Sequence, residues 1–178
     1  SAASDVYKRQ MYQLIVRLDD SDADVSELAW ETLERIAPIF PSSSELRLED
    51  LLKRPNKPDR DHAFRVLRSI SREWVEAGCQ HIESLMKEEE VDLRRRSAKL
   101  LRIITERGGA VGWDLIAWAL EDTDPNVRSS GADCLPRLAS VEPRIAAILV
   151  EASLGEKDST VRMKILRAIK SLDMQNPR

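Results

Sequence analysis

The apolar residues of this chain recur with a period of 34 residues. Six aligned columns, at offsets −11, −7, 0, 4, 8 and 11 from a reference position, hold Ala, Val, Ile, Leu or Met at 27 of 30 places. Random placement would fill about 13 of them. Offsets 0, 4, 8 and 11 share one side of a helix, and −11 and −7 share one side of another. Each segment therefore predicts two antiparallel helices, and the reference positions are Val25, Asp59, Leu93, Val127 and Val161.

An acidic turn followed by arginine links the two helices of most repeats. In the fourth repeat it reads Asp122-Thr-Asp124-Pro125-Asn-Val127-Arg128, and four of the five reference positions are followed by arginine. This pattern resembles the HEAT-like repeat family, and the resemblance covers residues 11–173. It implies an all-α fold, a right-handed α-solenoid of five two-helix HEAT-like repeats. The second repeat departs from the pattern at Arg54, Asn56 and Asp59.

The ends of the chain require separate treatment. Residues 1–10 resemble a translated sequencing adapter, so we expect a non-native tail on a metagenomic fragment whose first helix begins at Met11. Apolar Leu28 and Trp30 beside the first core stripe predict further repeats or another domain upstream. We expect the repeats at about residues 11–37, 42–71, 73–105, 110–139 and 143–173, with a tail at 174–178.

Local signals refine the expected helices. Ser42 with Glu45 predicts a capping box at the start of the second repeat. Gly131 and Pro136 are expected to weaken or kink the second helix of the fourth repeat. Carboxylates in the acidic turns are expected to cap the second helices. At this position they also interact favourably with the positive end of the helix dipole.

The charged residues are distributed unevenly between the second helices and the rest of the chain. Aromatic residues make up 4% of the chain and charged residues 33%, and the formal net charge is only −3. The second helices, counted from offset 0 to 12, nevertheless carry a net +8, whereas the remaining residues carry −11. The overall charge does not indicate a nucleic-acid or membrane binder, but the second helices present a basic surface.

At 100° per residue, offsets 2, 6, 9 and 13 of each second helix point away from the core. Basic residues in this outward row are the candidates for partner binding, with an ordinary solvated face as the alternative. They are Arg65, Arg68, Arg72, Arg95, Lys99, Arg102, Arg167 and Lys170.

The HEAT-like resemblance implies a structural role for the arginines that follow the reference positions. In that family such arginines pair with acids of neighbouring turns, which fixes the geometry between repeats. The expected ladder consists of Asp22, Arg60, Glu90, Arg94, Asp124, Arg128, Asp158 and Arg162.

Residues for catalysis or metal binding are sparse. His62, His81, Cys79 and Cys134 lack the spacing of a metal site, and Gly108 with Gly109 does not make a phosphate loop. We expect no enzyme activity, metal or cofactor. Two cysteines and the lack of a membrane-length apolar run predict a cytoplasmic, soluble chain.

Three functions agree with the sequence. The favoured hypothesis is a non-catalytic scaffold whose second-helix face binds an extended, acidic segment of a protein partner. The first alternative is a nucleic-acid-binding protein, because HEAT-like repeats occur in DNA-alkylation-repair glycosylases. A third is an accessory role in a bilin-lyase-like protein, which the resemblance permits and no residue supports.

Overall fold

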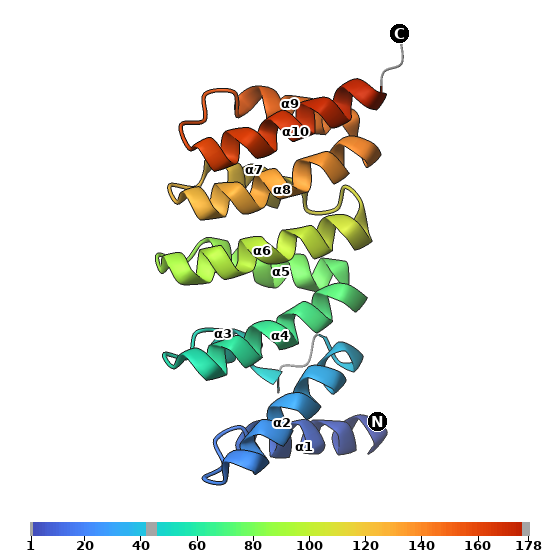
Figure 1. The fold of residues 1–178 in the computed structure, drawn as a ribbon. Helices are drawn as coiled ribbons and strands as arrows, with labels where there is room; N and C mark the ends of the chain where they lie inside the picture. Colours follow the sequence, from blue (N-terminus) through green and yellow to red (C-terminus); the bar gives the residue numbers. More distant parts are fainter. Residues whose placement is uncertain (1, 42–45, 176–178) are drawn as a thin grey trace. The chain divides into compact units, whose positions relative to one another are not determined.

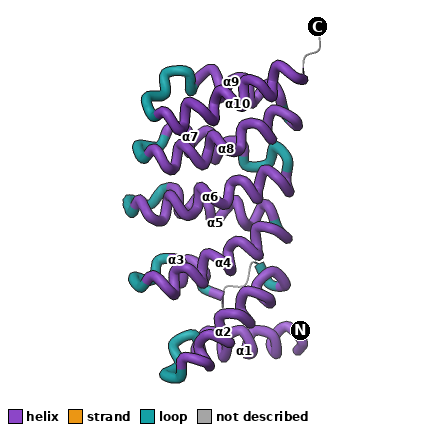
Figure 2. Tube along the Cα trace, in the orientation of Figure 1, coloured by secondary structure: helices purple, strands orange, loops and turns teal. Residues whose placement is uncertain are grey.

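The computed structural model describes residues 2–41 and 46–175, and these residues form helices and turns without any strand (Figure 2). They fall into two compact units that divide between Ala77 and Gly78. The prediction of an all-α fold built from helix pairs is confirmed.

The first unit contains two helix pairs. Helices α1 (Ala2–Arg17) and α2 (Ala23–Ile36) form the first repeat and lead into a short 3-10 turn, η1 (Ala37–Ile39). Helices α3 (Leu48–Leu52) and α4 (Lys57–Glu73) form the second. Helix α2 packs on α1 and α4, so the two repeats share one core. Helix α5 (Val75–Met86) begins at the boundary between the units.

The second unit holds the remaining helices: α6 (Val91–Gly108), α7 (Trp113–Glu121), α8 (Pro125–Val141), α9 (Pro143–Ala152) and α10 (Ser159–Gln175). Helix α8 packs against α6 on one side and α10 on the other, and α7 and α9 also pack on it. Figure 1 shows α6, α8 and α10 side by side in one layer, with α7 and α9 in another. The second helices of this unit therefore share a surface.

The predicted core columns are buried in the middle repeats, except at the half-buried Asp59 and Leu120. At offset 8 the leucines of the first four repeats have no exposed surface, and at offset 4 all five residues are buried. The largest departures occur in the outermost repeats, where Val25 is 39% exposed, Ile169 is 37% exposed and Leu154 is 62% exposed. The 34-residue period thus records burial between neighbouring helix pairs.

One expectation about the first repeat was wrong. Helix α1 begins at Ala2 and not at Met11, and residues 2–10 contain no glycine or proline that would break a helix. The expectation of an upstream neighbour stays a prediction, but Trp30 does not support it. Its side chain is 2% exposed because it stacks on His62 of the second repeat, with ring centroids 5.2 Å apart.

The acidic turns cap the second helices as predicted. Asp22, Asp124 and Asp158 each accept backbone N–H bonds from the first turn of the helix that follows. In the second repeat Asn56 does the same for α4, with its side-chain oxygen 2.8 Å from the Asp59 nitrogen. The turn that departs from the pattern is therefore still capped.

Two local predictions have different outcomes. The Ser42 and Glu45 capping box lies outside the described residues. Helix α8 runs from Pro125 to Val141 as one helix despite Gly131 and Pro136. Gly131 packs closely against α7, where a Cβ atom would lie 2.9 Å from the Ala119 Cβ atom.

Candidate interaction surface

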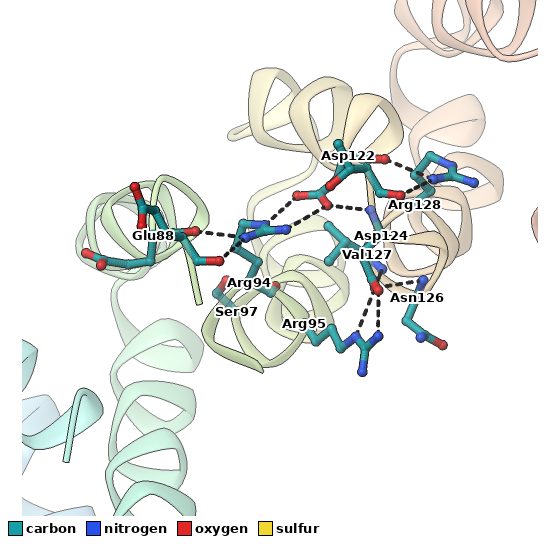
Figure 3. A network of polar contacts seen from close by, with 11 residues as sticks. Glu88, Arg94, Arg95, Ser97, Asp122, Asp124, Asn126, Val127 and Arg128 are labelled. Atoms are coloured by element: carbon teal, nitrogen blue, oxygen red, sulfur yellow. Dashed lines mark hydrogen bonds and ion pairs between the residues drawn. The ribbon is translucent and has the colours of Figure 1, made fainter. Parts of the chain in front are cut away.

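Arg94, in the first turn of α6, joins the third repeat to the turn between α7 and α8 in the fourth repeat. Its Nη1 donates to the carbonyl oxygens of Glu88 and Glu89 in its own turn, at 2.9 and 2.8 Å. Its Nε donates to the Asp122 carboxylate in the next turn at 2.9 Å (Figure 3). One planar guanidinium thus ties two successive turns together.

Arg128 repeats this arrangement between the fourth and fifth repeats. Its Nη1 donates to the carbonyl oxygens of Asp122 and Thr123, both at 3.0 Å. Its Nε and Nη2 donate to the two oxygens of Glu156, at 2.8 and 3.0 Å. The Glu156 side chain is only 8% exposed, so the bidentate pair is largely shielded from water.

The other predicted ladder arginines also donate to carbonyl oxygens of their own turns. Arg60 donates to the Arg54 carbonyl oxygen, and Arg162 donates to the carbonyl oxygens of Glu156 and Lys157. Glu90 stands at the N-cap position of α6 without a side-chain capping bond.

The carboxylates that accept from Arg94 and Arg128 are Asp122 and Glu156, and neither belongs to the ladder expected from the sequence. Both lie five residues before a reference position, where the column reads Asp20, Arg54, Glu88, Asp122 and Glu156. Because four of these five residues are acidic, this column could have identified the partners of the arginines from the sequence. The predicted acids Asp124 and Asp158, two residues later, are the helix caps.

An ion pair also links the first two repeats, but here the later repeat supplies the arginine and the earlier repeat supplies the acid. The first repeat has Ser26 where the others have arginine, and the second has Arg54 where the others have an acid. Arg54 donates to both oxygens of Asp19, at 2.7 and 3.0 Å, and to Asp59 at 2.8 Å. Here the arginine belongs to the later turn and the acid to the earlier one, the reverse of the order in the later repeats. The departures at Arg54 and Asp59 therefore still provide a bridge between turns.

The outward row of the second unit contains exposed cations with and without partners. Among the described residues, the exposed side chains of Lys99 on α6 and Lys170 on α10 make no polar contact, and the Arg167 guanidinium contacts only the Met163 sulfur. Arg102 is exposed but pairs with Glu106, one turn further along α6, at 2.7 Å.

Arg95 behaves differently from the rest of its row. It is half-buried, and its Nε donates to Asp124 on the neighbouring turn at 2.9 Å (Figure 3). This candidate for partner binding therefore also bridges the third and fourth repeats.

In the first unit, Arg65, Arg68 and Arg72 are exposed on α4 as predicted. Arg65 lies 3.6 Å from a Glu34 oxygen, whereas Arg68 makes no polar contact among the described residues. Glu34 belongs to the acidic row of α2, so the charge of Arg65 is partly balanced within the unit.

Among the described residues, no group of three His, Cys, Asp or Glu is placed to bind a metal ion. Burial raises the pKa of the Cys134 thiol to about 11, so this thiol stays protonated and unreactive near neutral pH. His62 lies 3.2 Å from Glu27 and stacks on Trp30, which is a packing role.

The bridges between turns predict an acid-sensitive second unit. Arg128 holds the pKa of Glu156 at about 2, below its ordinary 4.5, and Arg95 holds that of Asp124 at about 2, below 3.8. Both pKa values are depressed in the folded state, so their stabilisation is full above pH 4.5 and declines as the pH falls toward 2. We expect the urea midpoint, followed by circular dichroism, to drop between pH 6 and pH 3.

Glu156→Gln provides the control for this prediction. The variant should be less stable than the wild type at pH 6, and its midpoint should fall less steeply between pH 6 and pH 3, because one of the two titrating bridges is gone. Parallel pH profiles for the two proteins would contradict a role for Glu156.

Known proteins resemble this chain in fold. No family model and no curated protein matches it. Among solved structures, an engineered protein superimposes with a TM-score of 0.54 at 16% identity, covering 93% of this chain and 97% of its own. A protein solved in work on TOG–tubulin binding specificity gives 0.57 at 15% identity, covering 97% and 68%. A second engineered protein gives 0.50 at 14%, covering 92% and 98%.

These similarities show the fold: this chain is a helical-repeat protein. At such low identities they do not transfer a partner. Within the described residues, no helix has both the length and the apolar character needed to span a membrane.

Proposed function

We propose that this chain is a non-enzymatic HEAT-like scaffold that binds an extended acidic segment of a protein partner on the outward surface of its second helices. The acidic turns of the third, fourth and fifth repeats are each followed by an arginine, which supports the HEAT-like assignment. The main observation behind the proposal is that acidic and basic side chains of the second unit differ in their contacts. The acids of its last two turns, Asp122, Asp124, Glu156 and Asp158, are engaged in caps and bridges. By contrast, Lys99, Arg167 and Lys170 point outward without a carboxylate partner among the described residues.

The distribution of these cations favours an extended ligand. Lys99 lies on α6 and Lys170 on α10, and α8 packs between those two helices. The exposed acid on α8, Asp133, is held by Lys164 of α10. A ligand that follows the row would therefore meet unpaired cations on both sides of α8, and charge complementarity would orient it.

The helical-repeat neighbours are consistent with this proposal. The TOG structure concerns binding to tubulin, a protein partner, through a fold of the same kind. Nucleic-acid binding uses the same positive charge and is a defined outcome of the test below. The accessory bilin-lyase role has no support among the described residues.

The test uses a fluorescent peptide of about twelve residues, half of them Glu or Asp, as a probe for an acidic segment. We expect salt-dependent binding by fluorescence anisotropy. The triple variant Lys99→Glu, Arg167→Glu, Lys170→Glu should raise Kd by about tenfold or more, because three attractive contacts become repulsive. Circular dichroism should remain unchanged, since all three side chains are exposed.

Arg144→Glu is the matched control for Lys170→Glu. Both residues are exposed, both belong to the fifth repeat, and neither has a polar side-chain contact among the described residues, but Arg144 lies on α9. Only Lys170→Glu should weaken the peptide. Equal effects of the two variants, or no binding by the wild type, would overturn the proposal. Tighter binding of a single-stranded oligonucleotide of equal charge would favour the nucleic-acid alternative.

A further inference from the structure

The flank of α10 at offsets 1, 5, 8 and 12 is exposed, although the same flank is covered elsewhere. In the first, third and fourth repeats the residue at offset 5 is at most 2% exposed and the leucine at offset 8 is fully buried. The corresponding residues of the fifth repeat, Leu166 and Ile169, are 63% and 37% exposed. The flank is therefore a packing surface that lacks its cover.

The arginine at offset 1 of the fifth repeat, Arg162, also makes fewer contacts than its counterpart Arg128. Arg128 uses Nη1 for the carbonyl oxygens of its own turn and Nε with Nη2 for a carboxylate. Arg162 makes only the first set of contacts among the described residues. Its Nε and Nη2 remain available for an acid on whatever covers the flank.

The residue at offset 12 distinguishes between possible covers. In the first four repeats this position holds a small side chain that is at most 1% exposed, whereas the fifth repeat has the exposed Asp173. Another repeat stacked in the usual way would bury this carboxylate, which is costly without a cation. The cover must therefore present a positive charge opposite Asp173 and a negative charge opposite Arg162.

A second copy of α10 meets both requirements. The flank reads Arg162, Leu166, Ile169, Asp173, with spacings of four, three and four residues, so the sequence of spacings is the same in either direction. When two such helices pack antiparallel about a two-fold axis, Arg162 lies level with Asp173 of the other copy. Leu166 then lies level with the other copy's Ile169. This is the self-complementarity of an isologous dimer.

We propose that this chain forms a homodimer in which the two α10 helices pack antiparallel through Arg162, Leu166, Ile169 and Asp173. The outward row with Arg167 and Lys170 lies on a different side of α10, so the dimer leaves that row accessible. The proposal is independent of the acidic-partner function.

The first test is the oligomeric state by sedimentation velocity between about 1 and 100 µM, a range that detects modest dimer affinities. We expect a concentration-dependent dimer for the wild-type chain and a monomer for Leu166→Glu. Met163→Glu is the matched control, because Met163 is 52% exposed on the same helix but lies in the outward row. A wild-type monomer throughout, or an equal loss for both variants, would overturn the proposal.

A charge exchange tests the antiparallel register. Asp173→Arg alone should raise the dimer Kd by about tenfold or more, because two arginines then face each other at each end of the interface. The double variant Arg162→Asp, Asp173→Arg should restore dimerisation, since each new aspartate faces a new arginine. A dimer that tolerates Asp173→Arg, or that the double variant does not recover, would contradict this register.

Discussion

Replacing Gly131 with leucine should destabilise the second unit by about 3 kcal/mol, at the upper end of the usual cost of overpacking a core. A Cβ atom at this position would lie 2.9 Å from the Ala119 Cβ atom, 3.2 Å from the Leu120 nitrogen and 3.3 Å from the Ile116 oxygen. Two of these contacts are with backbone atoms of α7, which cannot move aside as a flexible side chain could. Helix α8 would have to separate from α7, and the core between them would open.

The measurement is urea unfolding followed by far-ultraviolet circular dichroism, with amide hydrogen exchange in α8 to assign the loss to the second unit. Gly155→Leu is the matched control. A Cβ atom at Gly155 has no neighbour within 4 Å, and the residue is exposed. This variant should change the free energy of unfolding by no more than about 0.5 kcal/mol. Equal effects at the two glycines would show that close helix packing is not the reason for Gly131.

The sequence was sufficient to predict the helix pairs, because burial of one side of a helix imposes a period that side-chain identity alone reveals. Leu33, Leu67, Leu101 and Leu135 were placed in the core from their spacing, and all four are fully buried. The same angular argument placed Arg68, Lys99 and Lys170 outward, where the structure exposes them.

What the sequence did not predict depends on lateral distances between neighbouring helices. The helical angle gives the direction of the Arg95 Cβ atom but not the reach of its long side chain. The guanidinium extends sideways to Asp124. For the same reason the acids opposite Arg94 and Arg128 were assigned two residues too late. A one-dimensional period identifies which turns meet, whereas the spacing of the turns decides which oxygen receives the bond.

Trp30 shows the same limit on the apolar side. Its offset correctly placed it beside the core stripe, but the offset did not say which neighbour covers it. The structure places it against the second repeat, where Arg54 lies 5.7 Å from its ring centroid and His62 stacks on it. The exposed residue of the pair is Leu28, at 63%.

Trp30→Ala should therefore destabilise the first unit by about 3 to 5 kcal/mol, the usual cost of truncating a buried tryptophan. The variant would leave a cavity between α2 and α4 and would remove the aromatic support of His62 and Arg54. Hydrogen exchange in α2 and α4, together with urea unfolding, measures the loss. Leu28→Ala, on the same helix, should stay within about 0.5 kcal/mol of the wild type. A small effect of Trp30→Ala would mean that the second repeat holds its position through the Arg54 and Asp19 ion pair and not through the tryptophan.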